Sequence, residues 1–328
     1  MQLDVIIPTF NRQDLLPRTL KSLLEADLPQ ELTVHVNVVD NNSKDRTRQI
    51  VDEWMNRFDG RLHYLFEPIQ GRSAALNKGI LSTTGELVGM IDDDEEIHRQ
   101  WYETVQKAFT HNHIDFIGGP YYPCWGAECP DWLPRKYAGV IGWIDGGSQV
   151  CPFNRSYPGI LMGGNAVIRR AILTKVGLYS TALGRTDTHL LAGEDEEMYE
   201  RLLNAGARGL YLPDLIIYHY IPPQRLTKSY FRKWCFWRGV SMGLLHRVHQ
   251  RQSAIKQLWG IPRYLYGEAL RGFKRKLQDA LRLKIDSEQG FAGELAAWDL
   301  AGYLYGRHFY KPVATNKSTK GLAVISSV

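Results

Sequence analysis

The chain has 328 residues, 44% of them hydrophobic, and a formal net charge of +5, which suits a globular protein with one large core or two modest ones. No apolar run approaches the roughly 20 residues that cross a bilayer, so we expect no transmembrane helix. The opening MQLDVIIPTF contains Asp4 and Pro8 and lacks the pattern of a signal peptide.

The charge is distributed unevenly along the chain. Residues 225–284 hold 15 Lys and Arg against two acidic residues, a balance of +13, so the remaining residues hold 25 basic and 33 acidic side chains, a balance of −8. This predicts an acidic, catalytic-looking part and a basic C-terminal part that face different partners. Four cysteines lack the paired CxxC spacing of a zinc site, which favours reduced thiols in the cytosol: Cys124, Cys129, Cys151 and Cys235.

The first part of the chain alternates strand patterns with helical ones. Strands are expected at residues 3–8, 33–40, 61–66, 86–91 and 115–119. Helices are expected at 15–26, from the capping residues Ser43 and Asp45 through Phe58, at 72–82 and at 100–111. This order predicts an α/β fold with a mainly parallel sheet and helices on both faces.

Polar clusters follow three of these strands: Pro8-Thr9, Asp40-Asn41 and Asp92 to Asp94. Ligands of parallel sheets bind beyond the carboxyl ends of the strands, so we expect the three clusters to converge on one edge. Clusters from separate strands that meet at one edge indicate a ligand-binding site.

The last cluster belongs to five consecutive carboxylates, residues 92–96. Adjacent carboxylates repel, and their burial is costly unless a positive charge compensates, so the run favours a divalent cation site. The alternative is a solvated acidic loop that caps the next helix, an environment that suits Glu95 and Glu96.

Residues 120–164 are rich in Trp, Tyr, Pro and Gly and look too irregular for core strands. We expect a ligand-facing loop whose aromatic faces can stack on rings such as those of sugars, with ordinary packing as the alternative. The candidates are Trp125, Trp132 and Trp143.

In the basic segment, Lys and Arg alternate with aromatic residues and leucine at roughly helical spacing. This pattern favours helices that lie on an anionic membrane surface. A helical subdomain with a solvated basic exterior is the alternative. Nucleic acid is disfavoured because no nucleic-acid-binding motif accompanies the charge.

Six stretches resemble the family 2 glycosyltransferases, which have the GT-A nucleotide-sugar fold. They follow the family's order over about residues 1–220: VIIPTFNR (5–12), VVDNNSKDRT (38–47), GRSAALNKGI (71–80), MIDDDEEI (90–97), GGNAVIRR (163–170) and GEDEEMYERLLNAG (193–206). The resemblance implies a Rossmann-like GT-A catalytic domain at 1–224. We expect a basic, mostly helical extension at 225–310 and a flexible tail at 311–328.

By this resemblance, Asp94 closes a DxD motif and binds Mn²⁺ or Mg²⁺, while Asp92 and Asp93 lie against the ribose and the diphosphate. Carboxylate oxygens suit these hard cations, which neutralise the charge that develops on the leaving nucleoside diphosphate. Some GT-A enzymes add a histidine ligand, and His219, expected at a strand end in IIYHY, is the candidate. A structural role for His219 is the alternative.

The resemblance also implies a nucleotide pocket. Its expected members are Pro8, Thr9, Arg12, Asp40, Asn41 and Arg72. Family members commonly have Asp-Asp where this chain has Asp40-Asn41. The Asn41 carbonyl oxygen can accept the imide proton of uracil or thymine, which favours a UDP-sugar, but its NH₂ also donates and leaves the base open. A capping turn at residues 40–43 and a surface ion pair for Arg72 are the alternatives.

The ED motif of the family places the catalytic base at Asp195, which would deprotonate the acceptor hydroxyl in an inverting transfer. Glu194 would orient the acceptor, and Asn165, after a double glycine, is a candidate contact in the sugar and acceptor pocket. Helix capping is the alternative role for Asp195. A retaining mechanism is disfavoured by this motif.

The sequence therefore predicts a metal-dependent, inverting glycosyltransferase of cell-surface polysaccharide or glycolipid synthesis. Its partners would be a nucleoside-diphosphate sugar, a saccharide or lipid-linked saccharide acceptor and an anionic membrane surface on the cytoplasmic side. A sugar-nucleotide nucleotidyltransferase is one rival, although IPTFNR is not a glycine-rich phosphate loop. A non-catalytic carbohydrate- or membrane-binding module is another, and the presence of Asp94 and Asp195 argues against it.

Overall fold

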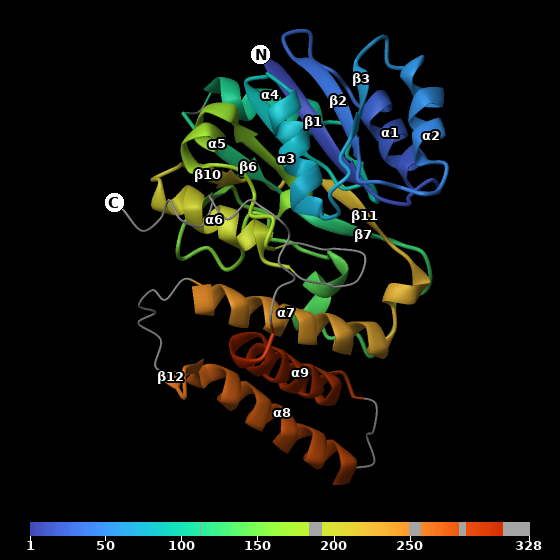
Figure 1. Ribbon diagram of the computed structural model, residues 1–328. Coiled ribbons are helices and arrows are strands. Elements are labelled where there is room, and N and C mark those ends of the chain that lie inside the picture. The colour runs from blue at the N-terminus through green and yellow to red at the C-terminus, as the bar shows by residue number, and fades with distance from the viewer. Residues whose placement is uncertain (112, 184–191, 249–256, 282–286, 311–328) are drawn as a thin grey trace. The chain divides into compact units, whose positions relative to one another are not determined.

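The computed structural model describes residues 1–111, 113–183, 192–248, 257–281 and 287–310 (Figure 1). The chain divides into two compact units. The first contains residues 1–179 and 195–230, and the second contains residues 180–194 and 231–328. The expected tail at 311–328 lies outside the described residues.

An eight-stranded sheet forms the centre of the first unit. Its order is β3 (Leu62–Phe66), β2 (Thr33–Asp40), β1 (Gln2–Thr9), β4 (Leu87–Met90), β9 (Ala166–Arg169), β6 (Phe116–Gly118), β10 (Gly209–Tyr211) and β8 (Cys151–Phe153). The pairs among β1 to β4 and the β6–β10 pair are parallel, whereas β9 and β8 run antiparallel to their neighbours. The predicted α/β fold with a mostly parallel sheet is confirmed.

Helices cover both faces of this sheet. One buried cluster joins the strands to α1 (Leu16–Glu25), α2 (Thr47–Met55) and α4 (Trp101–His111). A second cluster joins them to α3 (Arg72–Ser82), α5 (Arg170–Val176) and α6 (Glu194–Asn204). Strand β1 supplies Leu3, Val5 and Ile7 to the first cluster and Ile6 to the second, which explains its continuous apolar run.

A second, three-stranded sheet contradicts two of the expectations from sequence. It consists of β5 (Glu95–Ile97), β11 (Ile217–Ile221) and β7 (Tyr121–Trp125) in that order. Residues 95 and 96 therefore lie in a strand and not in a helix-capping loop, because β5 pairs with β11. Residues 121–125 are likewise not irregular. Short 3₁₀ helices lie between strands at Arg135–Ile141 and Gly163–Asn165, and a third, Pro223–Arg225, follows β11.

The basic region is helical, as expected. It contains α7 (Lys228–Val248), the short strands β12 (Gln257–Leu258) and β13 (Ile261–Pro262), α8 (Arg263–Leu281) and α9 (Glu288–His308). Glycines let the helices approach closely: a Cβ at Gly272 of α8 would lie 2.5 Å from the Gly293 carbonyl oxygen of α9. None of the described helices combines the length and apolar composition needed to span a bilayer.

Candidate active site

The carboxyl ends of β1, β2 and β4 lie side by side. Thr9 is the register partner of Asp40, and the Asn41 N–H donates to the Thr9 carbonyl oxygen over 2.8 Å. On the other side of β1, Ile6 is the partner of Met90, so the acidic run after β4 begins near the same edge. The expected convergence of three polar clusters is observed.

Both carboxylate oxygens of Asp40 are bonded within the protein. Oδ1 accepts from the Ser43 N–H and Oδ2 accepts from the Tyr64 hydroxyl, each over 2.8 Å. Burial and the contact with Asp40 raise the pKa of Tyr64 to about 12, so the phenol remains a donor at neutral pH. The turn that was the alternative interpretation of residues 40–43 is present, and it fixes Asp40 at the end of β2.

The Asn41 side chain holds the loop that leads into α3. Its NH₂ donates to the carbonyl oxygens of Glu67 and Ile69 over 3.1 and 2.6 Å, and its Oδ1 accepts from the Gly71 N–H over 2.7 Å. A carboxylate cannot donate to those two carbonyls, which explains why Asn stands where the family commonly has Asp. The side chain thereby positions Arg72, the first residue of α3.

Four arginines lie against the acidic run. Their ion pairs are Arg72 with Asp92 (2.8 Å), Arg12 with Asp93 (3.5 Å) and Asp94 (3.8 Å), Arg225 with Asp94 (3.1 Å), and Arg18 with Glu96. The repulsion within the run is thus relieved in part by the chain's own guanidinium groups.

Glu95 is the most deeply buried member of the run, with 2% of its surface exposed. Its Oε2 accepts from the Asp92 N–H over 2.8 Å, and a Cβ at Gly164 would lie only 2.4 Å from Oε1, so the carboxyl group needs a glycine there. Burial, together with the charges of Asp92 and Asp94, raises the pKa of Glu95 well above its usual value. Burial and the neighbouring Asp94 raise the pKa of Asp93 to about 7.

Asp94 is the member of the run held in the ionised state. Burial acts to raise its pKa, but contacts with His219, Arg225 and Arg12 hold the pKa well below its usual value. Arg225 lies 3.1 Å from Oδ2, and the Nε2 atom of His219 lies 3.5 Å from Oδ1. A histidine nitrogen and a carboxylate oxygen therefore face each other beside a guanidinium group.

The hydrogen bonds of His219 assign its tautomer. Nδ1 lies 2.8 Å from the Ile141 carbonyl oxygen, which can only accept, so Nδ1 carries the proton. Nε2 lies 3.1 Å from Nη1 of Arg225, which can only donate, so Nε2 presents the lone pair of the neutral imidazole, whereas in the imidazolium its proton faces Asp94. His219 lies in the middle of β11 and not at a strand end, because residues 217–221 pair with β7 and residues 217–219 also pair with β5.

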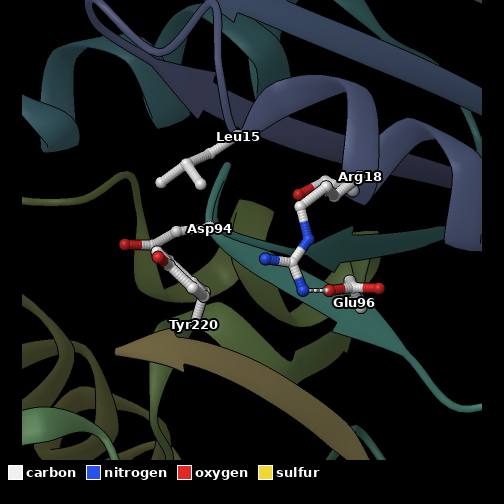
Figure 2. A pocket seen from close by; sticks show the side chains of 6 residues that line it. Leu15, Arg18, Asp94, Glu96 and Tyr220 are labelled. Atoms are coloured by element: carbon white, nitrogen blue, oxygen red, sulfur yellow. Dashed lines mark hydrogen bonds and ion pairs between the residues drawn. The ribbon is translucent and has the colours of Figure 1, made fainter. Parts of the chain in front are cut away.

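Asp94 also lines a small pocket with about 140 Å³ of empty space. Figure 2 shows the Arg18 guanidinium directed at Glu96, with Asp94 and Tyr220 beside it. The guanidinium carbon lies 4.9 Å from the centre of the Tyr220 ring. Ligand pockets commonly occupy about 300–1,000 Å³, so this pocket is too small for a nucleotide sugar. It contributes a fixed ion pair beside Asp94.

Asp195 lies in the first turn of α6 and is held from two sides. Its Oδ2 accepts from the Gly163 N–H over 3.0 Å, and its Oδ1 lies 3.3 Å from Nη1 of Arg72. A Cβ at Gly163 would lie 2.2 Å from Oδ1, so the two glycines before β9 admit two carboxyl groups, those of Asp195 and Glu95. The adjacent Glu194 is the first residue of α6 and is buried.

Thr9 and Pro8 end β1. The Thr9 hydroxyl lies close enough to Asp93 to influence its ionisation. Within the part of the chain that the structure describes, however, this buried oxygen forms no hydrogen bond. A buried polar atom without a partner at a strand end is a feature that ligand-binding sites share.

Asn165 is bonded on all sides. Its Oδ1 accepts from the Trp101 indole over 2.9 Å, and its NH₂ donates to the carbonyl oxygens of Pro120 and Leu215 over 3.3 and 2.6 Å. The side chain is fully buried. These bonds give Asn165 a structural role; contact with the sugar stays a prediction and would require one of them to be shared.

The tryptophans expected to stack on sugars pack within the protein. Trp125 and Trp143 meet edge to face with ring centres 5.6 Å apart, and the Arg135 guanidinium lies 3.6 Å above the Trp143 ring. Lys228 lies 5.8 Å from the ring of Trp132. The packing alternative accounts for these contacts, and stacking on sugar stays a prediction.

The sequence did not single out Arg225 and Arg18, and it suggested only a helix-capping role for Glu95. Arg225 is 131 positions from its partner Asp94, so no local pattern connects them.

Within the described ranges, no group of three or more His, Cys, Asp and Glu side chains is arranged to hold a metal ion. Asp94 and His219 are a pair of possible ligands and not a complete site.

The chain matches Glycosyl transferase family 2 over residues 4–177. A glucosyl-dolichyl phosphate glucuronosyltransferase of Haloferax volcanii is 26% identical over 79% of this chain and 82% of the relative. A GalNAc(5)-diNAcBac-PP-undecaprenol beta-1,3-glucosyltransferase of Campylobacter jejuni is 36% identical over 36% of this chain and 37% of the relative. The solved structure of the mannosyltransferase PcManGT from Pyrobaculum calidifontis, in complex with GDP-Man and Mn²⁺, has a TM-score of 0.64 at 18% identity. That match covers 94% of this chain and 88% of the other.

The structural likeness shows that the sheet with its flanking helices is a GT-A fold. The family match covers more than half of the chain and includes the strand ends, the acidic run and the double glycine. It ends before α6 and β11. The protein belongs to glycosyl transferase family 2 and is a glycosyltransferase.

Proposed function

We propose that the enzyme transfers a sugar from a nucleoside-diphosphate sugar to a saccharide or lipid-linked saccharide, with inversion at the anomeric carbon. The observation that carries the proposal is the Arg72 guanidinium, which bonds Asp92 at one end and Asp195 at the other. One partly buried cation thus connects the carboxylate proposed for the donor side with the carboxylate proposed for the acceptor side.

Asp195 is the proposed general base. It would take the proton of the acceptor hydroxyl as the acceptor oxygen bonds to the anomeric carbon and the bond to the diphosphate oxygen breaks. The Gly163 N–H and Arg72 fix its carboxylate, and each of its oxygens retains a lone pair beyond these contacts. Such fixation is what a positioned base requires. We propose that Glu194 orients the acceptor.

The close contact of Gly163 with Asp195 gives one prediction. Gly163→Ala places a methyl group where the Asp195 carboxylate lies, so the base should shift and the transfer rate should fall on the order of 10²-fold. Steady-state kinetics measure the loss, and a nucleotide titration should show unchanged affinity for the diphosphate. Gly139→Ala is the matched control, because a Cβ at Gly139 has no neighbour within 4 Å. Equal rates for the two variants would contradict the role of Gly163.

Asp94 and His219 are residues that could hold a divalent cation. Asp94 and His219 offer an ionised carboxylate and an imidazole lone pair 3.5 Å apart, and Mg²⁺ sites commonly combine one or two protein ligands with substrate phosphates. A site completed by the donor accounts for the lack of a third protein ligand among the described residues. When bound, Mn²⁺ or Mg²⁺ would offset charge on the diphosphate. The similar mannosyltransferase of Pyrobaculum calidifontis was solved with Mn²⁺ beside its nucleotide sugar in the complex, which supports this assignment.

The donor would lie along the ends of β1, β2 and β4. Arg12 can pair with phosphate, and the unpartnered Thr9 hydroxyl offers a hydrogen bond at the same edge. Pro8, Asp40 and Asn41 would shape the pocket for base and ribose. We propose Asp92 and Asp93 for the ribose and diphosphate, and a UDP-sugar as the donor.

The acceptor proposal rests on the relatives. The names of two of them contain dolichyl phosphate and PP-undecaprenol, which are lipid carriers. A lipid-linked acceptor confines the reaction to a membrane surface, so we propose that the enzyme acts at the cytoplasmic face of a membrane. The basic helical extension would then be the part that meets anionic lipid.

A donor screen tests the function directly. We expect the protein to hydrolyse one nucleoside-diphosphate sugar slowly in the presence of Mn²⁺ and without acceptor. The screen compares UDP-, GDP- and ADP-sugars and measures the nucleoside diphosphate that is released. EDTA removes the metal ion in the control reaction. Isothermal calorimetry with the free diphosphates shows the base preference independently. If no nucleoside diphosphate binds and no donor is hydrolysed, the proposed donor class is wrong.

A further inference from the structure

Helix α8 carries a row of apolar side chains on its outer surface. Leu270, Phe273, Leu277 and Leu281 are 70%, 67%, 54% and 79% exposed. At roughly 100° per residue, the four positions fall within an arc of about 80° on one face of the helix. We call these four residues the α8 stripe. Contiguous exposed apolar surface of this kind marks an interaction site.

The other side of α8 packs against α9. Gly272 contacts Gly293 of α9 so closely that a Cβ on either residue would lie within 2.6 Å of the other's backbone. In helical projection Gly272 points roughly 140° away from the centre of the stripe. Lys276 binds Glu294 of α9 over 2.7 Å. The packed face is therefore separate from the stripe.

The charges around the stripe are sorted by sign. Helix α8 contains five cationic residues and two acidic ones. Arg263 and Lys274 project beside the stripe, and Arg271 follows on the same flank. The acidic residues, Glu268 and Asp279, project toward the packed side, where Asp279 accepts a hydrogen bond from the Ser287 hydroxyl. The charged residues beside the exposed leucine and phenylalanine side chains are thus Lys and Arg.

We propose that the α8 stripe lies in the interface of an anionic membrane, parallel to its surface. Leucine and phenylalanine would enter the boundary between headgroups and acyl chains, and the flanking cations would reach the lipid phosphates. A helix with a cationic rim suits anionic lipid better than a neutral protein groove. The inference rests on the proposed function for its purpose, since a lipid-linked acceptor lies in that membrane, but the surface can be tested without the reaction.

Vesicle binding by the full-length protein tests the proposal. The probes are vesicles of phosphatidylcholine with about 30% phosphatidylglycerol, and of phosphatidylcholine alone, in co-sedimentation at low and high salt. Wild type should bind the anionic vesicles and release at high salt. Phe273→Ser/Leu277→Ser should lower the partition coefficient at least tenfold. Arg263→Gln/Arg271→Gln/Lys274→Gln should lower it by a similar factor at low salt only.

Matched controls come from the first unit. Leu28→Ser/Leu81→Ser removes two apolar side chains that are 40% and 72% exposed, and Lys21→Gln/Arg99→Gln/Lys107→Gln removes three exposed cations. Both controls should bind vesicles like wild type. The proposal is overturned if wild type ignores anionic vesicles, or if the stripe variant binds as well as its control. It is also overturned if the stripe variant dissociates a dimer in analytical ultracentrifugation while vesicle binding is unchanged, since the occupant is then a second copy.

Donor hydrolysis without vesicles separates this inference from the proposed function. All these variants should hydrolyse the donor like wild type, because no substitution touches the site. If wild type lacks hydrolysis but binds vesicles through the stripe, the proposed function fails and the membrane surface stands. If hydrolysis is present but vesicle binding is absent, the proposed function stands and the membrane surface is wrong.

Discussion

Asp195→Asn is expected to retain donor binding and to lower the transfer rate by roughly 10²- to 10⁴-fold, the usual contribution of a general base. The amide is nearly isosteric with the carboxylate and can still accept from the Gly163 N–H through its oxygen. It cannot take up the acceptor's proton. Paired transfer assays and nucleotide titrations measure the two effects separately.

Glu200→Gln is the control for this substitution. Glu200 lies on the same helix and its side chain is 52% exposed, so the variant changes the same charge away from the site. It should transfer like wild type. Near-normal turnover of Asp195→Asn would remove Asp195 from the reaction and reopen the choice between Glu194 and a retaining mechanism.

Local patterns are enough to predict the framework of the site. Strands β1, β2 and β4 are readable because buried parallel strands are continuous apolar runs, and the polar residues that end them have to meet at the same edge. Strand β7 is not predicted, because Pro123 and the surrounding aromatic residues suggest a loop. It pairs with β11 at the edge of its three-stranded sheet, a position where proline is tolerated.

The electrostatics of the site cannot be predicted from local sequence. The acidic run suggests a place for a metal ion, and Glu95 suggests an exposed helix cap. In the fold, Glu95 is buried against Gly164, and arginines from distant segments reach the other carboxylates. Long-range pairs such as Arg225 with Asp94 depend on the three-dimensional path of the chain, and a single sequence does not record that path.

The function of Asn41 illustrates the same limit. Its departure from the family's acidic pair raises a question about base preference. The structure shows a different reason for the amide, since two backbone carbonyls need a donor that a carboxylate lacks. The sequence contains the substitution, but only the fold supplies its partners.

The second large effect is expected at Asp94, where we propose that a metal ion and arginine compete for the same atoms. Asp94→Ala should abolish the tightening of nucleoside diphosphate binding by Mn²⁺, because it removes the ionised ligand. Arg225→Gln should have the opposite effect and strengthen the binding of Mn²⁺ in the absence of nucleotide. Arg225 donates to the Asp94 carboxylate and to the His219 lone pair, and its loss frees both atoms, so Mn²⁺ should bind about tenfold tighter without nucleotide.

Electron paramagnetic resonance of free Mn²⁺ measures this binding without any reaction. Arg225→Gln should also melt at a lower temperature than wild type, since Asp94 is left buried without its partner, and added Mn²⁺ should restore the melting temperature. Arg18→Gln is the matched control: Arg18 pairs with Glu96 at the same edge, and its loss should leave Mn²⁺ affinity unchanged. Equal Mn²⁺ affinity in wild type and Arg225→Gln, or full metal enhancement in Asp94→Ala, would place the cation away from Asp94 and His219. If the same atoms of Asp94 and His219 bind either Arg225 or the metal ion, both results are required. Asp94→Ala must lose the effect of Mn²⁺ on nucleotide binding, and Arg225→Gln must gain affinity for Mn²⁺.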